Sequence, residues 1–179
     1  RELQDLSFKN LYPKRYETLR KAMQAFHRNR RDVISTVLSQ FSLRLVSENI
    51  EAQIKGREKH LYSIHQKMRN KKLRFDEVMD IYGFRVTVNS ISACYAALGA
   101  LHSLYPPKPG KIKDYIAIPK GNGYQSLHTT LTGPRGLPIE VQIRTRNMDA
   151  VAESGIASHW AYKSGTSKLD QATLNTNKW

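Results

Sequence analysis

Residues 113–130 read KDYIAIPKGNGYQSLHTT, and the interpretation of the whole chain starts from this stretch. Two β-like runs, 113–118 and 125–132, flank a Lys-Gly-Asn-Gly turn at residues 120–123. A turn with two glycines lets the backbone come close to a ligand, because neither glycine carries a Cβ. The side chains around the turn supply a flat ring for a purine base and cations for phosphate. They are Lys113, Lys120, Tyr124, Gln125 and His128.

The segments on either side of this stretch predict an α+β fold. Residues 138–145 follow a Gly-Pro-Arg-Gly turn and form a third strand candidate, and residues 51–55 and 80–88 are two more. We therefore expect a mixed, roughly five-stranded sheet with flanking helices. Apolar residues recur at helical spacing in five further segments, which are residues 14–27, 32–46, 58–69, 92–104 and 146–162.

Composition divides the chain into three parts. Residues 1–49 are expected to form a helical N-terminal lead-in, in which residues 1–13 look like a connector. Residues 50–163 carry the strand and turn signals and are expected to be the main domain. Residues 164–179 are polar and lack periodicity, so we expect a disordered tail there.

The chain is strongly basic, with a formal net charge of +14 and a pI near 10.0. Such a balance implies polyanionic partners such as nucleotides, nucleic acids or an acidic membrane surface, unless the basic surface has no specific role. Cys94 is the only cysteine, which excludes an internal disulfide and a cysteine-rich zinc site. No apolar segment approaches the length of a bilayer span and no signal peptide is evident, so we expect no membrane association and a cytoplasmic location.

A row of polar side chains in residues 58–69 predicts a phosphate-binding surface. Lys59, Ser63 and Lys67 are four residues apart and line one stripe of a helix, and Arg57 stands near its start. Cations and the free N–H groups of a helix N-terminus both attract a polyphosphate. A solvated basic face is the alternative interpretation.

Two carboxylates predict a magnesium site. In residues 138–145 the apolar side chains point one way, while Glu140, Gln142 and Arg144 point the other. Asp80 opens the apolar run 80–88 and is the natural partner of Glu140. Two carboxylates amid positive charge are typical of a Mg²⁺ site on a nucleotide. A solvent-facing stripe and a helix-capping Asp80 remain as alternatives.

Strict strand alternation raises a difficulty for this site. It places Arg85 and Asp80 on opposite faces of residues 80–88. If both side chains serve one site, Asp80 must sit at the entry of the strand, or the strand must bulge near Gly83.

Tyr124, Ser126 and His128 are each two residues apart, so they can line one face of their strand. Stacking of Tyr124 on a base contributes about 1–3 kcal/mol in comparable sites. The alternatives are an ordinary edge aromatic for Tyr124 and a structural role for His128.

Together these segments resemble the synthetase domain of the RelA/SpoT family, the enzymes that make guanosine tetra- and pentaphosphate. The matching stretches occur in order between about residues 50 and 163: GREKHLYSIHQKM, RFDEVMDIYGFRV, PGKIKDYIAIPKGNGYQSLHTTL, IEVQIRT and ASHWAYK. Residues 14–50 resemble the helices that join this domain to a preceding hydrolase domain in long members. Residues 74–77 resemble the basic version of a signature associated with bifunctional members.

The resemblance implies a pyrophosphokinase of the stringent response, built on a nucleotidyltransferase-like palm. The β,γ-diphosphate of ATP would pass to the 3′-hydroxyl of GDP or GTP, with Mg²⁺ as cofactor, giving ppGpp or pppGpp and AMP. It also implies a hydrolase domain and C-terminal regulatory domains in the full-length protein. Any ribosome or tRNA contact would be made only through those absent domains. A non-catalytic nucleotide- or RNA-binding or regulatory module remains an alternative, as does a nucleotidyltransferase acting on an RNA end.

The resemblance also implies roles for single residues on the donor side. Arg57 and Arg85 would sandwich the adenine, and the ATP phosphates would be held by Lys59, Ser63 and Lys67. The metal would be bound by Asp80 and Glu140, and Glu140 would also activate the 3′-hydroxyl. The residues expected to carry catalysis are therefore Asp80, Glu140, Lys67 and Arg57.

On the acceptor side the resemblance implies that Tyr124 stacks on the guanine. The remaining contacts to the acceptor nucleotide or the transferring phosphates would come from Lys113, Lys120, Asn122, His128 and Gln142. Two small departures from the usual family pattern stand nearby. Lys111 replaces a common Arg and Gly121 replaces a common Ala, and neither changes the expected activity class.

Overall fold

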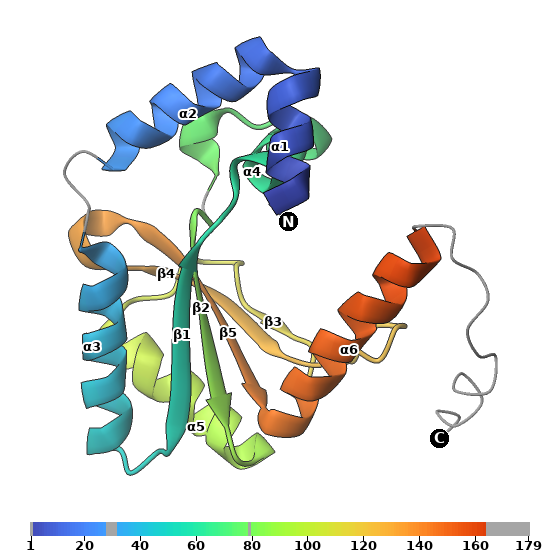
Figure 1. Ribbon diagram of the computed structural model, residues 1–179. Helices are drawn as coiled ribbons and strands as arrows, with labels where there is room; N and C mark the ends of the chain where they lie inside the picture. The colour runs from blue at the N-terminus through green and yellow to red at the C-terminus, as the bar shows by residue number, and fades with distance from the viewer. Residues whose placement is uncertain (1, 28–31, 79, 164–179) are drawn as a thin grey trace.

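The computed structural model describes residues 2–27, 32–78 and 80–163, with side chains described up to residue 154 except those of residues 2 and 76. Its centre is a five-stranded mixed sheet (Figure 1). The β2–β5 pair is parallel and the other neighbours are antiparallel. The predicted α+β class and mixed sheet are confirmed. In spatial order the strands are β1 (Ala52–Glu58), β2 (Tyr82–Val88), β5 (Pro138–Thr145), β4 (Leu127–Thr132) and β3 (Lys113–Asp114).

One face of the sheet is apolar and forms the core. Successive side chains of a strand point to opposite faces, so Phe84, Val86, Val141 and Ile143 all point to this one and are buried. The helices α3 (Val33–Ser47) and α5 (Ile91–Leu104) pack on it and contact each other. Cys94 of α5 is fully buried in this core.

The other face is polar, and the strand register aligns its side chains in rows. One row runs through Arg57, Gly83, Glu140 and Thr130 across four strands. The last helix, α6 (Arg146–Lys163), contacts β2 and β5, and its acidic side chains reach arginines on this polar face. The next row holds Lys55, Arg85, Gln142, His128 and Lys113.

A second group of helices lies at one end of the sheet, at the top of Figure 1. It comprises α1 (Glu2–Leu11), α2 (Pro13–His27) and α4 (Leu61–Lys71). The expectation of a connector at residues 1–13 was wrong, because α1 has tertiary partners that hold it. Phe8 is buried and stacks on His65 of α4, with 4.5 Å between ring centroids, and Asp5 accepts a hydrogen bond from the backbone N–H of Tyr62.

Three predicted boundaries also need correction. The first strand continues through Arg57 to Glu58, because it pairs with β2 along its whole length, and α4 therefore begins only at Leu61. The predicted strand 113–118 shrinks to two residues, because the Asp114 carboxylate accepts the backbone N–H groups of Ile116 and Ala117 and turns the chain. Tyr124 precedes β4 instead of lying in it, because the pairing of β4 with β5 begins only at Leu127.

Two short 3₁₀ turns complete the described elements, η1 (Phe75–Glu77) and η2 (Pro134–Gly136). The predicted turn between residues 132 and 138 is the second of them. The polar tail predicted at residues 164–179 lies outside the described residues.

None of the described helices combines the length and apolar character needed to cross a membrane.

Candidate active site

Two lysines and two carboxylates meet where β2 begins. Asp80 sits at the entry of β2, which is one of the two arrangements that a shared site with Arg85 requires. Lys59 leaves the end of β1, and its backbone N–H donates to the carbonyl of Ile81 at 2.8 Å, which places its side chain beside Asp80. The Lys59 ammonium pairs with Asp80 Oδ2 and lies 3.9 Å from Glu140 Oε2. The structure therefore brings together the two carboxylates that the sequence predicts as partners.

Lys67 completes this cluster from α4. Its Nζ lies 2.5 Å from Asp80 Oδ2, so two cations contact one carboxylate oxygen. Ser63 precedes Lys67 by one turn of the same helix. Lys59, however, stands in the connector between β1 and α4 and not on the helix, so the predicted helical stripe is only partly correct.

Asp80 is held ionised although it is 6% exposed. Burial alone raises the pKa of this carboxyl, but the hydrogen bonds from Lys59 and Lys67 outweigh it and leave the pKa below its usual value. The second oxygen, Oδ1, is buried and has no hydrogen-bond partner among the described residues. A buried, unpartnered carboxylate oxygen calls for a ligand, and a cation fits it.

The residues present fit a magnesium ion of the nucleotide-bound kind. Among the described residues, no group of three or more His, Cys, Asp or Glu side chains gathers as a metal cluster. Mg²⁺ does not need such a cage, because it is commonly held by one or two carboxylates together with waters and substrate phosphates. Asp80 and Glu140 supply those two carboxylates.

Glu140 connects the lysine cluster to the predicted acceptor side. Burial tends to raise its pKa, but the neighbouring His128 imidazole and the charge of Lys59 lower the pKa below the usual value. His128 Nδ1 lies 3.6 Å from Glu140 Oε1, and His128 Nε2 lies 2.7 Å from the Tyr124 hydroxyl. A continuous polar path thus joins Glu140 to Tyr124 through one imidazole.

The loop that carries Tyr124 is ordered by its own hydrogen bonds. The N–H of Gly123 donates to the carbonyl of Lys120, and the side chain of Asn122 accepts the N–H of Tyr124 at 3.2 Å. Gly123 has a φ of 75°, a left-handed conformation that glycine adopts without strain. The predicted tight turn is therefore present. Lys120 Nζ lies 5.1 Å from the centroid of the Tyr124 ring, which keeps a cation beside that ring.

The two arginines predicted to hold one base stand on neighbouring strands. Arg57 is exposed and lies in β1, not at the start of a helix as predicted. It pairs with Gly83, which in turn pairs with Glu140. A Cβ built at Gly83 would meet only the carbonyl oxygen of Arg57, at 4.0 Å, so the space above this glycine is open. Arg85 lies two residues further along β2, on the same face.

The remaining predicted residues lie on the same sheet face. Gln142 stands between Arg85 and His128 in the strand register, and the exposed Lys113 pairs with His128 at the edge. The polar face thus gathers side chains from strands that are far apart in the sequence, from β1 to β5.

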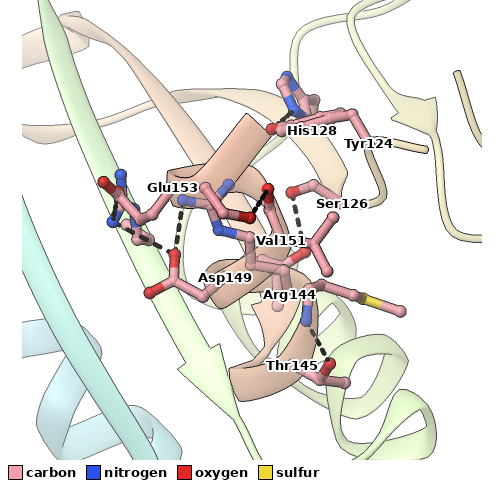
Figure 2. Close-up of polar contacts among 12 residues, drawn as sticks. Tyr124, Ser126, His128, Arg144, Thr145, Asp149, Val151 and Glu153 are labelled. Atoms are coloured by element: carbon pink, nitrogen blue, oxygen red, sulfur yellow. Dashed lines mark hydrogen bonds and ion pairs between the residues drawn. The ribbon is translucent and has the colours of Figure 1, made fainter. Parts of the chain in front are cut away.

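Sequence reasoning missed the acidic partners of the arginines. Arg85 Nη1 lies 2.8 Å from Glu153 and 3.2 Å from Asp149. Arg144 Nη2 lies 2.6 Å from Asp149, and Figure 2 shows Arg144, Asp149 and Glu153 close to one another. A signal was available, because Asp149 and Glu153 are four residues apart in a predicted helix. Like charges at that spacing repel one another unless cations face them.

The family follows from a comparison with protein-family models. Residues 56–167, more than half of the chain, match the model described as a region found in RelA / SpoT proteins. The chain belongs to the RelA/SpoT family. Its members include relatives that are similar over nearly the whole chain. The bifunctional (p)ppGpp synthase/hydrolase SpoT of Escherichia coli K12 is 51% identical over 99% of this chain, and the RelA of the same description from Mycobacterium tuberculosis is 47% identical over 90%.

These curated relatives are much longer proteins. The chain spans 25% of the length of the first relative and 22% of the second.

Solved structures of the family share the fold. Small alarmone synthetase 2 from Bacillus subtilis is 30% identical, with a TM-score of 0.62 over 78% of this chain and 80% of that one. Small alarmone synthetase 1 from the same organism, bound to its product pppGpp, has a TM-score of 0.66 over 86% and 87% of the two chains at 24% identity. The sheet and its flanking helices are therefore those of the RelA/SpoT-type synthetases.

Proposed function

We propose that this chain is the synthetase domain of a (p)ppGpp synthetase. It transfers the β,γ-diphosphate of ATP to the 3′-hydroxyl of GDP or GTP and releases AMP. The observation that carries the proposal is the cluster of Lys59, Lys67, Asp80 and Glu140 on the open polar face of the sheet. The similarity to relatives named as bifunctional (p)ppGpp synthase/hydrolases supports the choice of reaction.

The reaction is a displacement at the β-phosphorus of ATP. A bond forms between the ribose O3′ of the acceptor and Pβ, and the bond between Pβ and the oxygen on Pα breaks, so AMP leaves with that oxygen. The 3′-hydroxyl loses its proton as the bond forms. Such transfers depend mainly on positioning and on neutralisation of phosphate charge, and little covalent chemistry is asked of the protein.

The donor side is built from β1, the connector after it, and α4. Lys59 and Lys67 bind the triphosphate, and Ser63 faces it one turn earlier on the helix. Arg57 on β1 stands opposite Gly83, Arg85 stands two residues beyond Gly83 on β2, and the two arginines hold the adenine between them. Because a guanidinium is flat and weakly hydrated, it stacks on a base better than an ammonium does.

The acceptor side is built from the loop before β4 and from the strands beside it. Tyr124 stacks on the guanine, while Lys113, Lys120, Asn122, His128 and Gln142 contact the acceptor nucleotide. Glu140 takes the proton of the 3′-hydroxyl. Its lowered pKa keeps it ionised at neutral pH, so it is ready to accept that proton.

A magnesium ion would be held by Asp80 and Glu140. When bound, it supplies positive charge to the phosphates at the position where charge develops. In the full-length protein, a hydrolase domain and regulatory domains would accompany this domain.

The test is direct. The protein is incubated with ATP, Mg²⁺ and either GDP or GTP, and the nucleotides are separated by chromatography. We expect AMP and 3′-diphosphorylated guanosine nucleotide in equal amounts. Release of pyrophosphate in place of AMP would point to a nucleotidyltransferase. Nucleotide binding without any turnover would instead leave a non-catalytic binding module.

A further inference from the structure

Asp149 lies between two arginines that serve different sides of the proposed site. Its Oδ1 is 2.6 Å from Arg144 Nη2 and 3.2 Å from Arg85 Nη1. Arg85 and Arg144 stand on the adjacent strands β2 and β5 and face the same side of the sheet. Two like charges at such neighbouring positions repel each other, so the carboxylate between them holds both guanidinium groups in place.

Arg144 depends on this carboxylate more than Arg85 does. It is 2% exposed, and its Nε has no hydrogen-bond acceptor among the described residues. Within the described part of the chain, Asp149 is the acidic side chain that forms an ion pair with this buried charge. A buried guanidinium without its counter-ion is strongly unfavourable. The position of the Arg144 side chain therefore follows that of Asp149.

Arg144 in turn lies beside the tyrosine proposed to hold the guanine. Its Cζ is 6.0 Å from the centroid of the Tyr124 ring, and Figure 2 shows these residues together with His128 and Asp149. The Tyr124 hydroxyl and His128 are hydrogen-bonded to each other, which fixes the hydroxyl end of the tyrosine ring. The chain of contacts thus runs from Arg85 through Asp149 and Arg144 to Tyr124.

We propose that Asp149 couples the two nucleotide subsites. It is a positioning residue that links the adenine-binding Arg85 to the guanine-binding Tyr124. This inference rests on the proposed function, because it takes the two subsites from it. A base stacked on Arg85 restrains that guanidinium, and through Asp149 it restrains Arg144 beside the Tyr124 ring. Each nucleotide then favours the binding of the other by the same factor, since coupling between two binding sites is reciprocal.

Glu153 provides a matched control on the same helix. It is exposed and lies 2.8 Å from Arg85, whereas the buried Arg144 pairs with Asp149 instead. Loss of the Glu153 charge therefore affects the adenine side alone. Asp149→Asn and Glu153→Gln each remove one negative charge and keep the shape of the side chain.

The experiment measures the affinity for GDP by calorimetry with and without α,β-methylene-ATP, in which a methylene replaces the oxygen that would leave with AMP. For the wild-type protein we expect the analogue to tighten GDP binding by about fivefold or more, a typical size for such coupling. In Asp149→Asn the ratio of the two GDP affinities falls to near one. In Glu153→Gln the ratio stays at the wild-type value, although the analogue binds more weakly.

Asp149→Asn leaves Arg144 buried without a full counter-charge, so its thermal unfolding is measured first. If it does not fold, the double variant Arg144→Met/Asp149→Leu replaces the test, because it removes both charges and fills the buried site with apolar side chains. Its ratio is also expected to fall to near one.

The inference is overturned if the ratio of the two GDP affinities is one in the wild-type protein. It is also overturned if either Asp149 variant keeps the ratio found in the wild type. A purely structural role for Asp149 would weaken both affinities and leave the ratio unchanged. Different results would contradict the proposed function: both nucleotides bind to the wild-type protein but no AMP is formed, or neither nucleotide binds to it.

Discussion

The two faces of the central sheet are made by alternate residues of the same strands, yet the two faces have different roles. In β5 the side chains of Ile139, Val141 and Ile143 are fully buried under α5, while Glu140 and Gln142 between them face the open polar side. The apolar face stabilises the fold, and the polar face concentrates charges that do not help to pack it. Substitutions at neighbouring residues of one strand should therefore affect stability and activity separately.

The largest effect is expected from Glu140→Gln. Removing the group that accepts the 3′-hydroxyl proton, and with it one proposed metal ligand, should lower kcat on the order of 10³-fold. The melting temperature should stay close to that of the wild type, because the introduced amide fills the same volume as the carboxylate on an open face. Initial rates of AMP formation, together with a thermal melt, check both statements.

A matched control for this charge exists on the surface. Glu51 pairs with Arg146 at 3.2 Å, and its side chain is 76% exposed. Glu51→Gln removes the same charge and should leave turnover unchanged. Wild-type turnover in Glu140→Gln, or an equal loss in both variants, would contradict the role of Glu140.

The next effect is expected on the opposite face of the same strand. Ile143→Ala removes a fully buried side chain and leaves a cavity, which should cost about 2–5 kcal/mol of the free energy of unfolding. Urea denaturation measures it. Ile118→Ala is the control, since that side chain is 76% exposed and its loss should change stability by less than about 0.5 kcal/mol. Similar losses in the two variants would show that the apolar face does not carry the stability.

The alternation of residues explains why the sheet was predictable. Residues 82–88 and 138–145 have a period of two, and the number of strand candidates along the chain predicts a sheet of about five strands. The region whose structure was predicted wrongly was α1. Its residues pack through single contacts, Phe8 on His65 and Asp5 on the backbone of Tyr62, made to a helix more than fifty positions away. Such long-range contacts leave no periodic pattern in the local sequence from which they could be predicted.

The site was predictable only in part for a related reason. The sequence indicates that Asp80 and Glu140 belong together, because basic residues outnumber acidic ones in this chain, and Asp80 opens one apolar run while Glu140 interrupts another. It does not indicate that Arg85 and Arg144 share Asp149, since that contact depends on the parallel register of β2 and β5 and on the direction in which α6 leaves the sheet. Local patterns predict the members of a face, and the strand register decides which of them meet.

Two glycines sharpen the comparison of the faces with smaller expected effects. A Cβ at Gly56 would lie 2.8 Å from Phe84 Cε1 and 2.9 Å from Ile34 Cγ2, on the packed side, whereas the space at Gly83 is open. Gly56→Ala should therefore destabilise the protein by about 1–3 kcal/mol. Gly83→Ala should keep the stability or gain up to about 1 kcal/mol, because an alanine restricts the unfolded chain. Its methyl group lies between Arg57 and Glu140, so it should raise the KM for ATP.

Urea denaturation and the KM for ATP test both glycine variants. The comparison of the faces would fail if Gly83→Ala destabilised the protein as much as Gly56→Ala. It would equally fail if Gly56→Ala raised the KM for ATP while Gly83→Ala left it unchanged.

The smallest effect concerns Asp114, which joins the two faces. On the packed side, its carboxylate accepts a hydrogen bond from the Tyr95 hydroxyl of α5 at 2.8 Å. It also accepts hydrogen bonds from the backbone N–H groups of Ile116 and Ala117, where the loop to Tyr124 starts. Partial burial tends to raise its pKa, but these hydrogen bonds leave the pKa below the ordinary value of 3.8. Since the folded pKa is the lower one, the stabilisation is present above pH 3.8 and is lost as the pH falls through the folded pKa.

The urea midpoints of the wild type and Asp114→Asn are therefore compared between about pH 7 and pH 3. We expect a difference below about 1 kcal/mol at neutral pH, because the group is partly exposed, and a smaller one in acid. All other titrating groups are common to the two proteins and cancel in the difference. A gap that stays constant, or widens below pH 3.8, would mean that the charged carboxylate does not hold this loop to α5.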